Sequence, residues 1–84
     1  MHASPLEFPC DYPVKVMGKR TPGFRAAMLE VLSDEAGVAL EVAERPSRDG
    51  TYVSLTVTLK VGSREQLERI YRRLHATGLV LYAL

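Results

Sequence analysis

Over the segment Tyr12–Met17, the apolar residues Tyr12, Val14 and Val16 alternate with Pro13, Lys15 and Met17. A period of two is typical of a strand with one buried face, and Pro13 is tolerated near the start of a strand, where its missing N–H costs little. Gly18 then ends the alternation. Residues 1–11 contain two prolines and follow no period. We therefore predict an extended N-terminal arm over residues 1–11 and a single domain over residues 12–84 that begins with this strand.

The hydrophobic period then changes from two to that of a helix. Thr21 suits the N-cap position and Pro22 the first helical position, while Gly37 suits a C-cap. Between them, apolar residues recur on one face at i, i+3, i+4, i+7 and i+8: Phe24, Ala27, Met28, Val31 and Leu32. This spacing predicts an amphipathic helix that begins at Pro22 and ends at Gly37.

Two further alternating segments follow, separated by turn residues that include the pair Asp49-Gly50. In the first, Val38, Leu40 and Val42 share a face, which predicts a second strand with these side chains inward. In the second, the inward positions are Val53, Leu55, Val57, Leu59 and Val61, and the outward positions are Tyr52, Ser54, Thr56, Thr58 and Lys60. One apolar and one polar face predict an antiparallel hairpin that is covered on one side only.

The last part of the chain predicts a second helix followed by a final strand. Ser63 followed by Gln66 forms a capping box at the start of a helix, and Gly78 ends that helix. Its apolar stripe consists of Leu67, Ile70, Tyr71 and Leu74. The final segment Leu79–Leu84 is apolar on both faces and fits a strand better than a helix at this length.

The order strand, helix, strand, strand, helix, strand predicts an α+β fold of the ferredoxin-like type. Two right-handed β-α-β units joined by a hairpin give a two-layer sandwich, with a four-stranded antiparallel sheet in the order 4-1-3-2 and both helices on one face. Enzymes, RNA-binding proteins, metal carriers and ligand-sensing domains all use this fold. The fold alone therefore does not indicate the function.

Composition and charge narrow the class of protein. The 84 residues carry 11 Lys and Arg against 10 Asp and Glu, a formal net charge of +1, so no overall field attracts nucleic acid or a membrane surface. The single cysteine, Cys10, cannot form an internal disulfide, and the first residues lack the features of a signal peptide. No segment approaches the ~20 apolar residues of a membrane span. We predict a cytoplasmic protein without a membrane partner.

Candidate catalytic and metal-binding residues are few. Phe24 and Arg25 follow a glycine-containing loop that resembles the phosphate-binding loop of acylphosphatases, which are small ferredoxin-like hydrolases, but the chain contains no asparagine to orient an attacking water. Cys10 has no histidine near it in sequence, and neither His2 nor His75 stands at a metal-ligand spacing from it. We predict a protein that is not an enzyme and uses no cofactor or metal.

The loop that joins the first strand to the first helix carries the clearest candidate for ligand binding. Free N–H groups at a helix N-terminus, together with two adjacent basic side chains, favour a carboxylate or phosphate group. Solvated basic side chains in an exposed turn are the alternative interpretation. The candidate residues for a small anionic ligand are Gly18, Lys19, Arg20 and Thr21.

RNA binding is a further alternative, because the segment around Tyr52 resembles the third strand of an RNA-recognition motif. That motif stacks bases on several aromatic side chains of its open sheet face, whereas Tyr52 is the only ring predicted on the outward face of this strand. Two arginines of the second helix have acidic residues four positions earlier, in the pairs Glu65–Arg69 and Glu68–Arg72, which predicts ion pairs within the helix. We therefore expect no nucleic-acid partner.

The final strand lies at an edge of the predicted sheet, and an edge with two apolar faces is a liability unless something covers it. Leu6 and Phe8 of the arm are one candidate cover, and a second protein chain is the other. The candidate residues for a docking surface, used in self-association or with another protein, are Tyr52, Ser54, Val80 and Tyr82. A protein partner suits a small domain without catalytic groups.

Short motifs along the chain resemble those of one protein family. They are FP at Phe8–Pro9, KVMG at Lys15–Gly18, RPS and GTYVS within Arg45–Ser54, and IYRRL at Ile70–Leu74. In combination they resemble the small bacterial YbeD-like proteins of unknown function, over residues 6–84. The resemblance implies a fold similar to that of ACT domains, which are ligand-sensing modules, and a regulatory role linked to lipoate or amino-acid metabolism.

ACT domains usually bind their ligand near the loop between the first strand and the first helix. The resemblance therefore also implies Gly18, Lys19, Arg20 and Thr21 as ligand-binding residues, although basic side chains in this loop depart from the usual ACT pattern. We expect a regulatory or adaptor protein that acts through protein contacts, with an ACT-like sensor of a small anion as the alternative.

Overall fold

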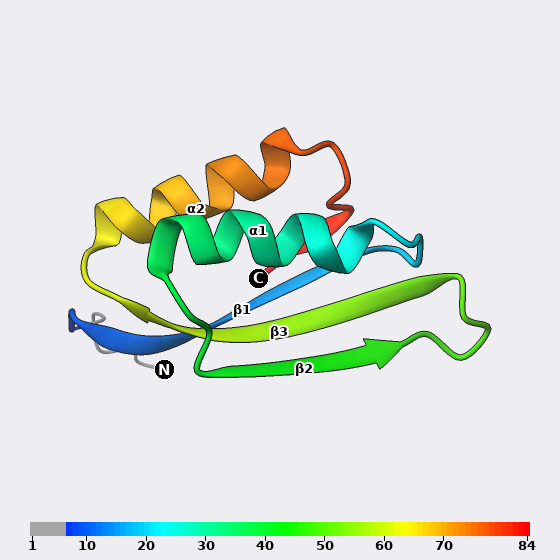
Figure 1. The fold of residues 1–84 in the computed structure, drawn as a ribbon, viewed down its shortest axis with the longest axis horizontal. Helices are drawn as coiled ribbons and strands as arrows, with labels where there is room; N and C mark the ends of the chain where they lie inside the picture. Colours follow the sequence, from blue (N-terminus) through cyan, green and yellow to red (C-terminus); the bar gives the residue numbers. More distant parts are fainter. Residues whose placement is uncertain (1–6) are drawn as a thin grey trace, which may run out of the picture.

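Residues 7–84 are described by the computed structural model of the chain. The elements are β1 (Cys10–Lys19), α1 (Phe24–Ala36), β2 (Glu41–Pro46), β3 (Tyr52–Val61), α2 (Arg64–Ala76) and β4 (Tyr82–Ala83). The four strands form one antiparallel sheet in the order β2-β3-β1-β4, and both helices lie on the same side of it (Figure 1). The predicted ferredoxin-like α+β fold is confirmed.

The core lies between the helices and the sheet. On the two central strands, Val14 is opposite Val57 and Val16 is opposite Leu55, and all four side chains are fully buried. The other buried apolar side chains are Val53, Leu59 and Val61 of β3, Phe24, Met28, Val31 and Leu32 of α1, and Leu67, Ile70 and Leu74 of α2. Full burial of one such side chain stabilises the folded chain by about 1.5–3 kcal/mol. Because the inward faces predicted for β1, β3 and the helices hold most of these side chains, those faces pack against one another.

The segment before β1 is only partly described. β1 begins at Cys10, two residues before Tyr12, and the division into an arm and a domain stays a prediction. Phe8 is half-buried and packs against the core just before the start of β1, whereas β4 pairs with β1 near its other end, at Val16 and Met17. Phe8 therefore does not cover β4, and Leu6 lies outside the described residues.

α1 begins two residues later than predicted. Its N-cap is Gly23 and its first residue is Phe24, so Pro22 is not helical. Thr21 N–H donates to the Lys19 carbonyl at 2.9 Å, and the Thr21 carbonyl accepts from Phe24 N–H at 3.2 Å. Because the backbone of Thr21 is part of a turn that precedes the helix, the prediction of Thr21 as N-cap is wrong.

β2 also begins later than predicted, at Glu41. Val38 is 90% exposed and Leu40 is exposed as well, so neither side chain faces inward. Gly37 adopts a φ of +77° at the end of α1, and the residues after it connect the helix to the edge of the sheet before pairing starts. Val42 is the one member of the predicted inward set that packs against the core.

β4 contains only Tyr82 and Ala83, so it is shorter at both ends than the predicted strand Leu79–Leu84. The chain before it approaches β1 closely at Gly18. A Cβ atom at Gly18 would overlap the Phe24 ring and would lie 2.6 Å from the Leu79 carbonyl oxygen. Glycine at this position is therefore a packing requirement, because any side chain would displace either the last connection or the first residue of α1.

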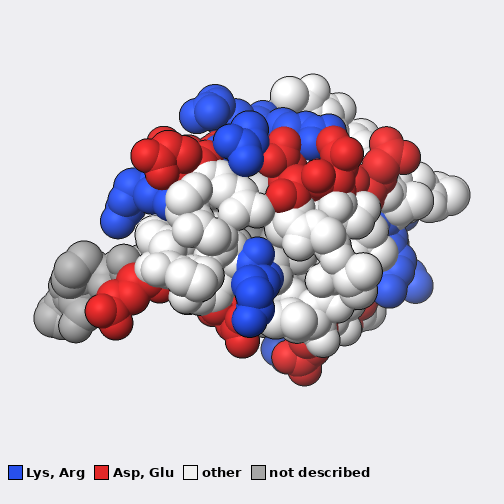
Figure 2. Space-filling view, turned by 60° about the vertical axis from the view of Figure 1, so that its left-hand side comes forward, with Lys and Arg blue, Asp and Glu red and all other residues white. Residues whose placement is uncertain are grey.

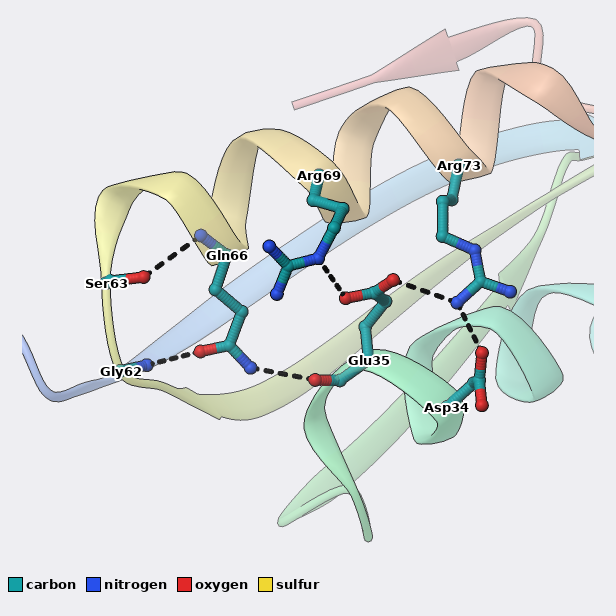
Figure 3. A network of polar contacts seen from close by, with 7 residues as sticks. All are labelled: Asp34, Glu35, Gly62, Ser63, Gln66, Arg69 and Arg73. Carbon is teal, nitrogen blue, oxygen red and sulfur yellow. Dashed lines mark hydrogen bonds and ion pairs between the residues drawn. The ribbon is translucent and has the colours of Figure 1, made fainter.

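A polar network joins the end of α1 to α2 (Figure 3). Glu35 accepts hydrogen bonds from Arg69 Nε at 2.7 Å and from Arg73 Nη1 at 2.9 Å, and Arg73 also pairs with Asp34. These contacts lower the pKa of the Glu35 carboxyl, and the hydrogen bond from Arg69 has the largest effect. Carboxylates near a helix C-terminus face the negative end of its dipole, and the arginines of α2 compensate for this. The predicted pair Glu65–Arg69 is therefore wrong, because Arg69 bonds to α1.

The capping box at the start of α2 belongs to the same network (Figure 3). Ser63 Oγ accepts from Gln66 N–H at 3.1 Å, as predicted. The Gln66 side chain also accepts from Gly62 N–H at 2.7 Å and donates to the last turn of α1 at 2.8 Å. Gln66 thus ties the start of one helix to the end of the other. The predicted ion pair between Glu68 and Arg72 is not found within residues 7–84.

Candidate functional site

Within the described residues, no element covers the face of the sheet opposite the helices, which we call the open face. Strand register places its side chains. Met17 of β1 is opposite Ser54 of β3, Arg45 of β2 is also opposite Ser54, and Tyr82 of β4 is opposite Met17. One row across the sheet therefore contains Arg45, Ser54, Met17 and Tyr82 in that order.

A hollow of about 610 Å³ lies on the open face near the turn between β2 and β3. Its lining includes the basic side chains Lys15, Arg45 and Arg48 and the uncharged side chains Met17, Tyr52 and Ser54, and none of the residues that line it is acidic. Lys19, opposite Tyr52, adds a fourth basic side chain beside it. We call these seven residues the basic hollow.

The turn between β2 and β3 holds one side of the basic hollow. Ser47 N–H donates to the Tyr52 carbonyl at 2.8 Å, and Tyr52 N–H donates to the Ser47 hydroxyl at 3.0 Å. The Asp49 carboxylate accepts from Thr51 N–H at 3.0 Å and from the Ser47 hydroxyl at 2.9 Å, and these bonds lower its pKa. Asp49 is thus engaged within the turn, and it forms no ion pair with Arg48 in the part of the chain that the structure describes.

The basic side chains of the hollow have no acidic partner among residues 7–84. The ion pairs there join Arg25 to Glu44, Lys60 to Asp11, and the arginines of α2 to Asp34 and Glu35. Along the helices, by contrast, basic and acidic side chains lie next to one another in a band above a mostly uncharged area, which a basic side chain interrupts (Figure 2). The hollow is therefore a local positive region on a chain whose net charge is only +1.

The four residues predicted to bind a small anion do not converge. Gly18 is buried, and Lys19 lies on the open face opposite Tyr52. Arg20 and Thr21 line a second hollow, of about 370 Å³, on the helix side of the sheet. The strand thus separates the two basic side chains of the loop, and each belongs to a different surface.

That second hollow mixes opposite charges. Besides Arg20 and Thr21, it is lined by Arg25 and Glu44, which form an ion pair at 2.6 Å. The arginine that resembles the phosphate-binding arginine of acylphosphatases is therefore paired with a carboxylate. A small anion bound here would compete with Glu44 for Arg25.

Three of the four predicted docking residues lie on the open face. Tyr52 and Ser54 line the basic hollow, and Tyr82 is next to Met17 in the row that crosses the sheet. Val80 is half-buried against the core and is separate from this surface. The open face therefore brings together most of the predicted docking set and adds a basic cluster to it.

Of the four basic residues of this surface, only Lys19 is among the predicted site residues, as part of the loop site, and Lys15, Arg45 and Arg48 are not. The alternation of β1 places Lys15 and Met17 outward, and this signal was available. Arg45 lies in the short edge strand β2, and Arg48 lies in the turn after it. Both come close to Lys15 because β2 and β1 pair with the same central strand, β3. The cluster thus required the strand order together with the alternation.

Residues 7–84 contain no group of three or more His, Cys, Asp or Glu side chains that could hold a metal ion. Cys10 is half-buried at the start of β1, opposite Val61.

Among residues 7–84, no helix combines the length and the apolar character needed to cross a bilayer.

Comparison with known proteins shows the family. Residues 3–84 match the family described as "Protein of unknown function (DUF493)". The chain belongs to this family. It is 44% identical over 77 residues to a UPF0250 protein of Bordetella parapertussis, covering 89% of this chain and 85% of that protein. It is also 44% identical over 82 residues to a UPF0250 protein of Paraburkholderia phytofirmans, covering 95% and 92%. The predicted membership of the YbeD-like proteins of unknown function is confirmed.

Solved structures support the fold of this DUF493 member. Protein HP0495 from H. pylori has a TM-score of 0.75 at 14% identity, covering 98% of this chain and 88% of that one. The C-terminal domain of the MgtC protein from Mycobacterium tuberculosis has a TM-score of 0.66 at 19% identity, covering 94% and 88%. At these identities the similarity shows the ferredoxin-like fold alone.

Proposed function

We propose that this DUF493 protein is a non-enzymatic adaptor or regulatory domain that binds another protein chain through the open face of its sheet. The observation that carries the proposal is the basic hollow, in which four basic side chains without acidic partners among residues 7–84 surround Met17, Tyr52 and Ser54. The resemblance to ACT-like regulatory proteins supports a regulatory role, linked to lipoate or amino-acid metabolism.

Four of the seven residues of the basic hollow are of types that protein interfaces favour, namely Met17, Arg45, Arg48 and Tyr52. Tyrosine, methionine and arginine are enriched at interfaces relative to the rest of a protein surface. Tyr52 and Tyr82 are 39% and 54% exposed, so each retains a large apolar area that a partner can cover. Tyrosine and arginine also dominate the residues whose truncation costs most binding energy.

A photo-crosslinking experiment tests the proposal. A benzoylphenylalanine residue replaces Tyr52 in the full chain, which is expressed in a bacterium that carries a family member, and the same residue replaces Arg64 on α2 as the matched control. Covalent adducts with another protein, or with a second copy of the chain, are expected from position 52 and not from position 64. Equal adducts from both positions, or none from position 52, would overturn the proposal.

A second candidate function is the sensing of a small anion in the hollow beside Arg20 and Thr21. The observation that favours it is that Arg20, Thr21 and Arg25 line this hollow together. A thermal-shift screen with lipoate, amino acids and inorganic phosphate tests it, since ligand at 100 times its Kd stabilises a protein by about 2.7 kcal/mol. A stabilising hit that Arg20→Ala removes and Lys19→Ala leaves intact would support this candidate. A flat screen would eliminate it.

A further inference from the structure

The basic side chains of the hollow are arranged around its centre. Lys15 and Lys19 stand two residues before and after Met17 on the same face of β1, which places them ~7 Å from it along the strand. Arg45 lies two strands away, across Ser54 from Met17, and Arg48 lies in the adjoining turn. An extended segment laid over Met17 would therefore have cationic groups on several sides.

The acidic residues of the described chain do not neutralise this cluster. Glu44 pairs with Arg25, Asp49 is engaged within the turn, and Asp34 and Glu35 pair with α2. The acidic residue of β2 on the open face is Glu41, four residues from Arg45, or ~13 Å along the strand. Positive charge on this surface is thus left for a partner to complement.

Resting on the proposed function, we infer that the partner contacts the open face with an acidic polypeptide segment. Its carboxylates bind Lys15, Lys19, Arg45 and Arg48, and an apolar side chain of the same segment covers Met17 between Tyr52 and Tyr82. Arginine binds carboxylates through two parallel hydrogen bonds, and complementary charge also accelerates and orients association.

The positions of the aromatic rings favour a polypeptide over RNA. Open-sheet RNA-binding domains stack bases on aromatic side chains of their sheet face. Here the central positions of β1 and β3 are occupied by Lys15, Met17 and Ser54, while Tyr52 begins β3 and Tyr82 lies on the edge strand. The Ser54 side chain is buried and its hydroxyl donates to the Arg45 carbonyl, so the centre of the face offers the Met17 thioether and no ring for a base to stack on.

Fluorescence anisotropy with defined probes tests the inference. The probe is a fluorescein-labelled peptide of twelve residues, made of glutamate and glycine with one central phenylalanine, titrated with the full chain at ~50 mM salt, a concentration at which exposed charges are little screened. The comparison probes are the same peptide with glutamine in place of glutamate, and an oligouridylate of twelve nucleotides. Binding of the glutamate peptide that weakens as salt increases is expected.

Two charge-reversal variants locate the binding. Arg45→Glu combined with Arg48→Glu is expected to raise the Kd of the glutamate peptide at least about tenfold, the loss expected from ~1.4 kcal/mol. Arg64→Glu combined with Arg72→Glu makes the same change in net charge on exposed positions of α2 and is expected to change the Kd less than about twofold. Circular dichroism confirms that both variants fold.

Several outcomes overturn the inference. Two of them concern the peptides, namely no binding of the glutamate peptide and binding of the glutamine peptide that is equally tight. A third is an equal loss of affinity in the two charge-reversal variants. The fourth is oligouridylate binding that is tighter than glutamate-peptide binding and that the Arg45 and Arg48 variant removes. The crosslinking experiment at position 52 is independent of these probes. If adducts form there while the glutamate peptide does not bind, the proposed protein contact stands and the acidic character of the partner is refuted.

Discussion

Arg69 of α2 donates from Nε to Glu35 of α1 at 2.7 Å, and this contact connects the two helices at the end of α1 (Figure 3). Replacing Glu35 with glutamine removes the charge that Arg69 and Arg73 share. We expect Glu35→Gln to lower the melting temperature by several degrees, because hydrogen bonds to a charged group are stronger than neutral ones. Glu30→Gln is the matched control on the same helix, since Glu30 has no ion pair among residues 7–84. Equal melting temperatures of the two variants would contradict the prediction.

The stability that Glu35 contributes depends on pH. The arginine contacts lower the pKa of Glu35 in the folded chain below its ordinary value of 4.5, so the unfolded chain binds the proton more readily. The stabilisation is therefore fully present above about pH 4.5 and is lost as the pH falls through the lower folded pKa. Melting curves of the wild type and of Glu35→Gln are expected to differ by a constant amount from pH 7 to pH 5 and to converge below pH 4. A difference that persists unchanged to pH 3 would refute this.

Gly18 is expected to tolerate no larger residue. In Gly18→Ala, the new Cβ would contact the Leu79 carbonyl and the Phe24 ring at distances that real Cβ atoms essentially never show, so one of them must move. Overpacking of this kind typically costs about 1–3 kcal/mol, measured as the free energy of unfolding in urea. Gly23→Ala is the control, since no atom lies within 4 Å of its added Cβ. A loss in Gly23→Ala as large as in Gly18→Ala would show that glycine flexibility, and not the close approach, is responsible.

The long elements of this fold could be predicted from the sequence, and the edges could not. β3 and the two helices show their periods over about ten residues or more, and their inward apolar faces are those predicted, although Ser54 on the outward face of β3 is buried as well. β2 and β4 are short and lie at the two edges of the sheet, so their extent depends on which neighbouring residues they pair with. Apolar residues in a connection have the same pattern as residues in a strand, and for this reason the pattern predicts Val38 and Leu40 as strand residues although they precede β2.

This explanation can be tested at Val38. Because its side chain is 90% exposed, Val38→Ser is expected to change the free energy of unfolding by less than about 0.5 kcal/mol, the usual range for surface substitutions. Val42→Ser, on the neighbouring edge strand, is expected to cost more, because Val42 packs against the core. Urea titration of both variants gives the comparison. A cost at Val38 that matches the cost at Val42 would place both side chains in the core.

The candidate site was predicted in part, and the reason lies in what alternation can and cannot show. Alternation along one strand predicts which residues share a face, and Tyr52 and Ser54 are on the open face as expected. The predicted strand order places β1 and β2 on either side of β3, but neither the order nor the alternation gives the register, so the approach of Arg45 and Lys15 to one hollow could not be predicted. Lys19 and Arg20 are adjacent in the predicted loop site, but Lys19 is the last residue of β1 and lies on the open face, whereas Arg20 follows the strand and lines the hollow on the helix side.

Lys19 and Arg20 therefore provide a sensitive test of the surface proposed for the partner. Lys19 is opposite Tyr52 on the open face, whereas Arg20 lines the hollow on the helix side of the sheet. With the glutamate peptide as probe, Lys19→Ala is expected to weaken binding about threefold or more, in the range of a single exposed ion pair, and Arg20→Ala is expected to leave the Kd unchanged. The two variants lose the same charge from neighbouring positions, so any effect of net charge is equal in both. Anisotropy titrations that show Arg20→Ala as the weaker binder would move the acidic segment from the open face to the helix side of the sheet.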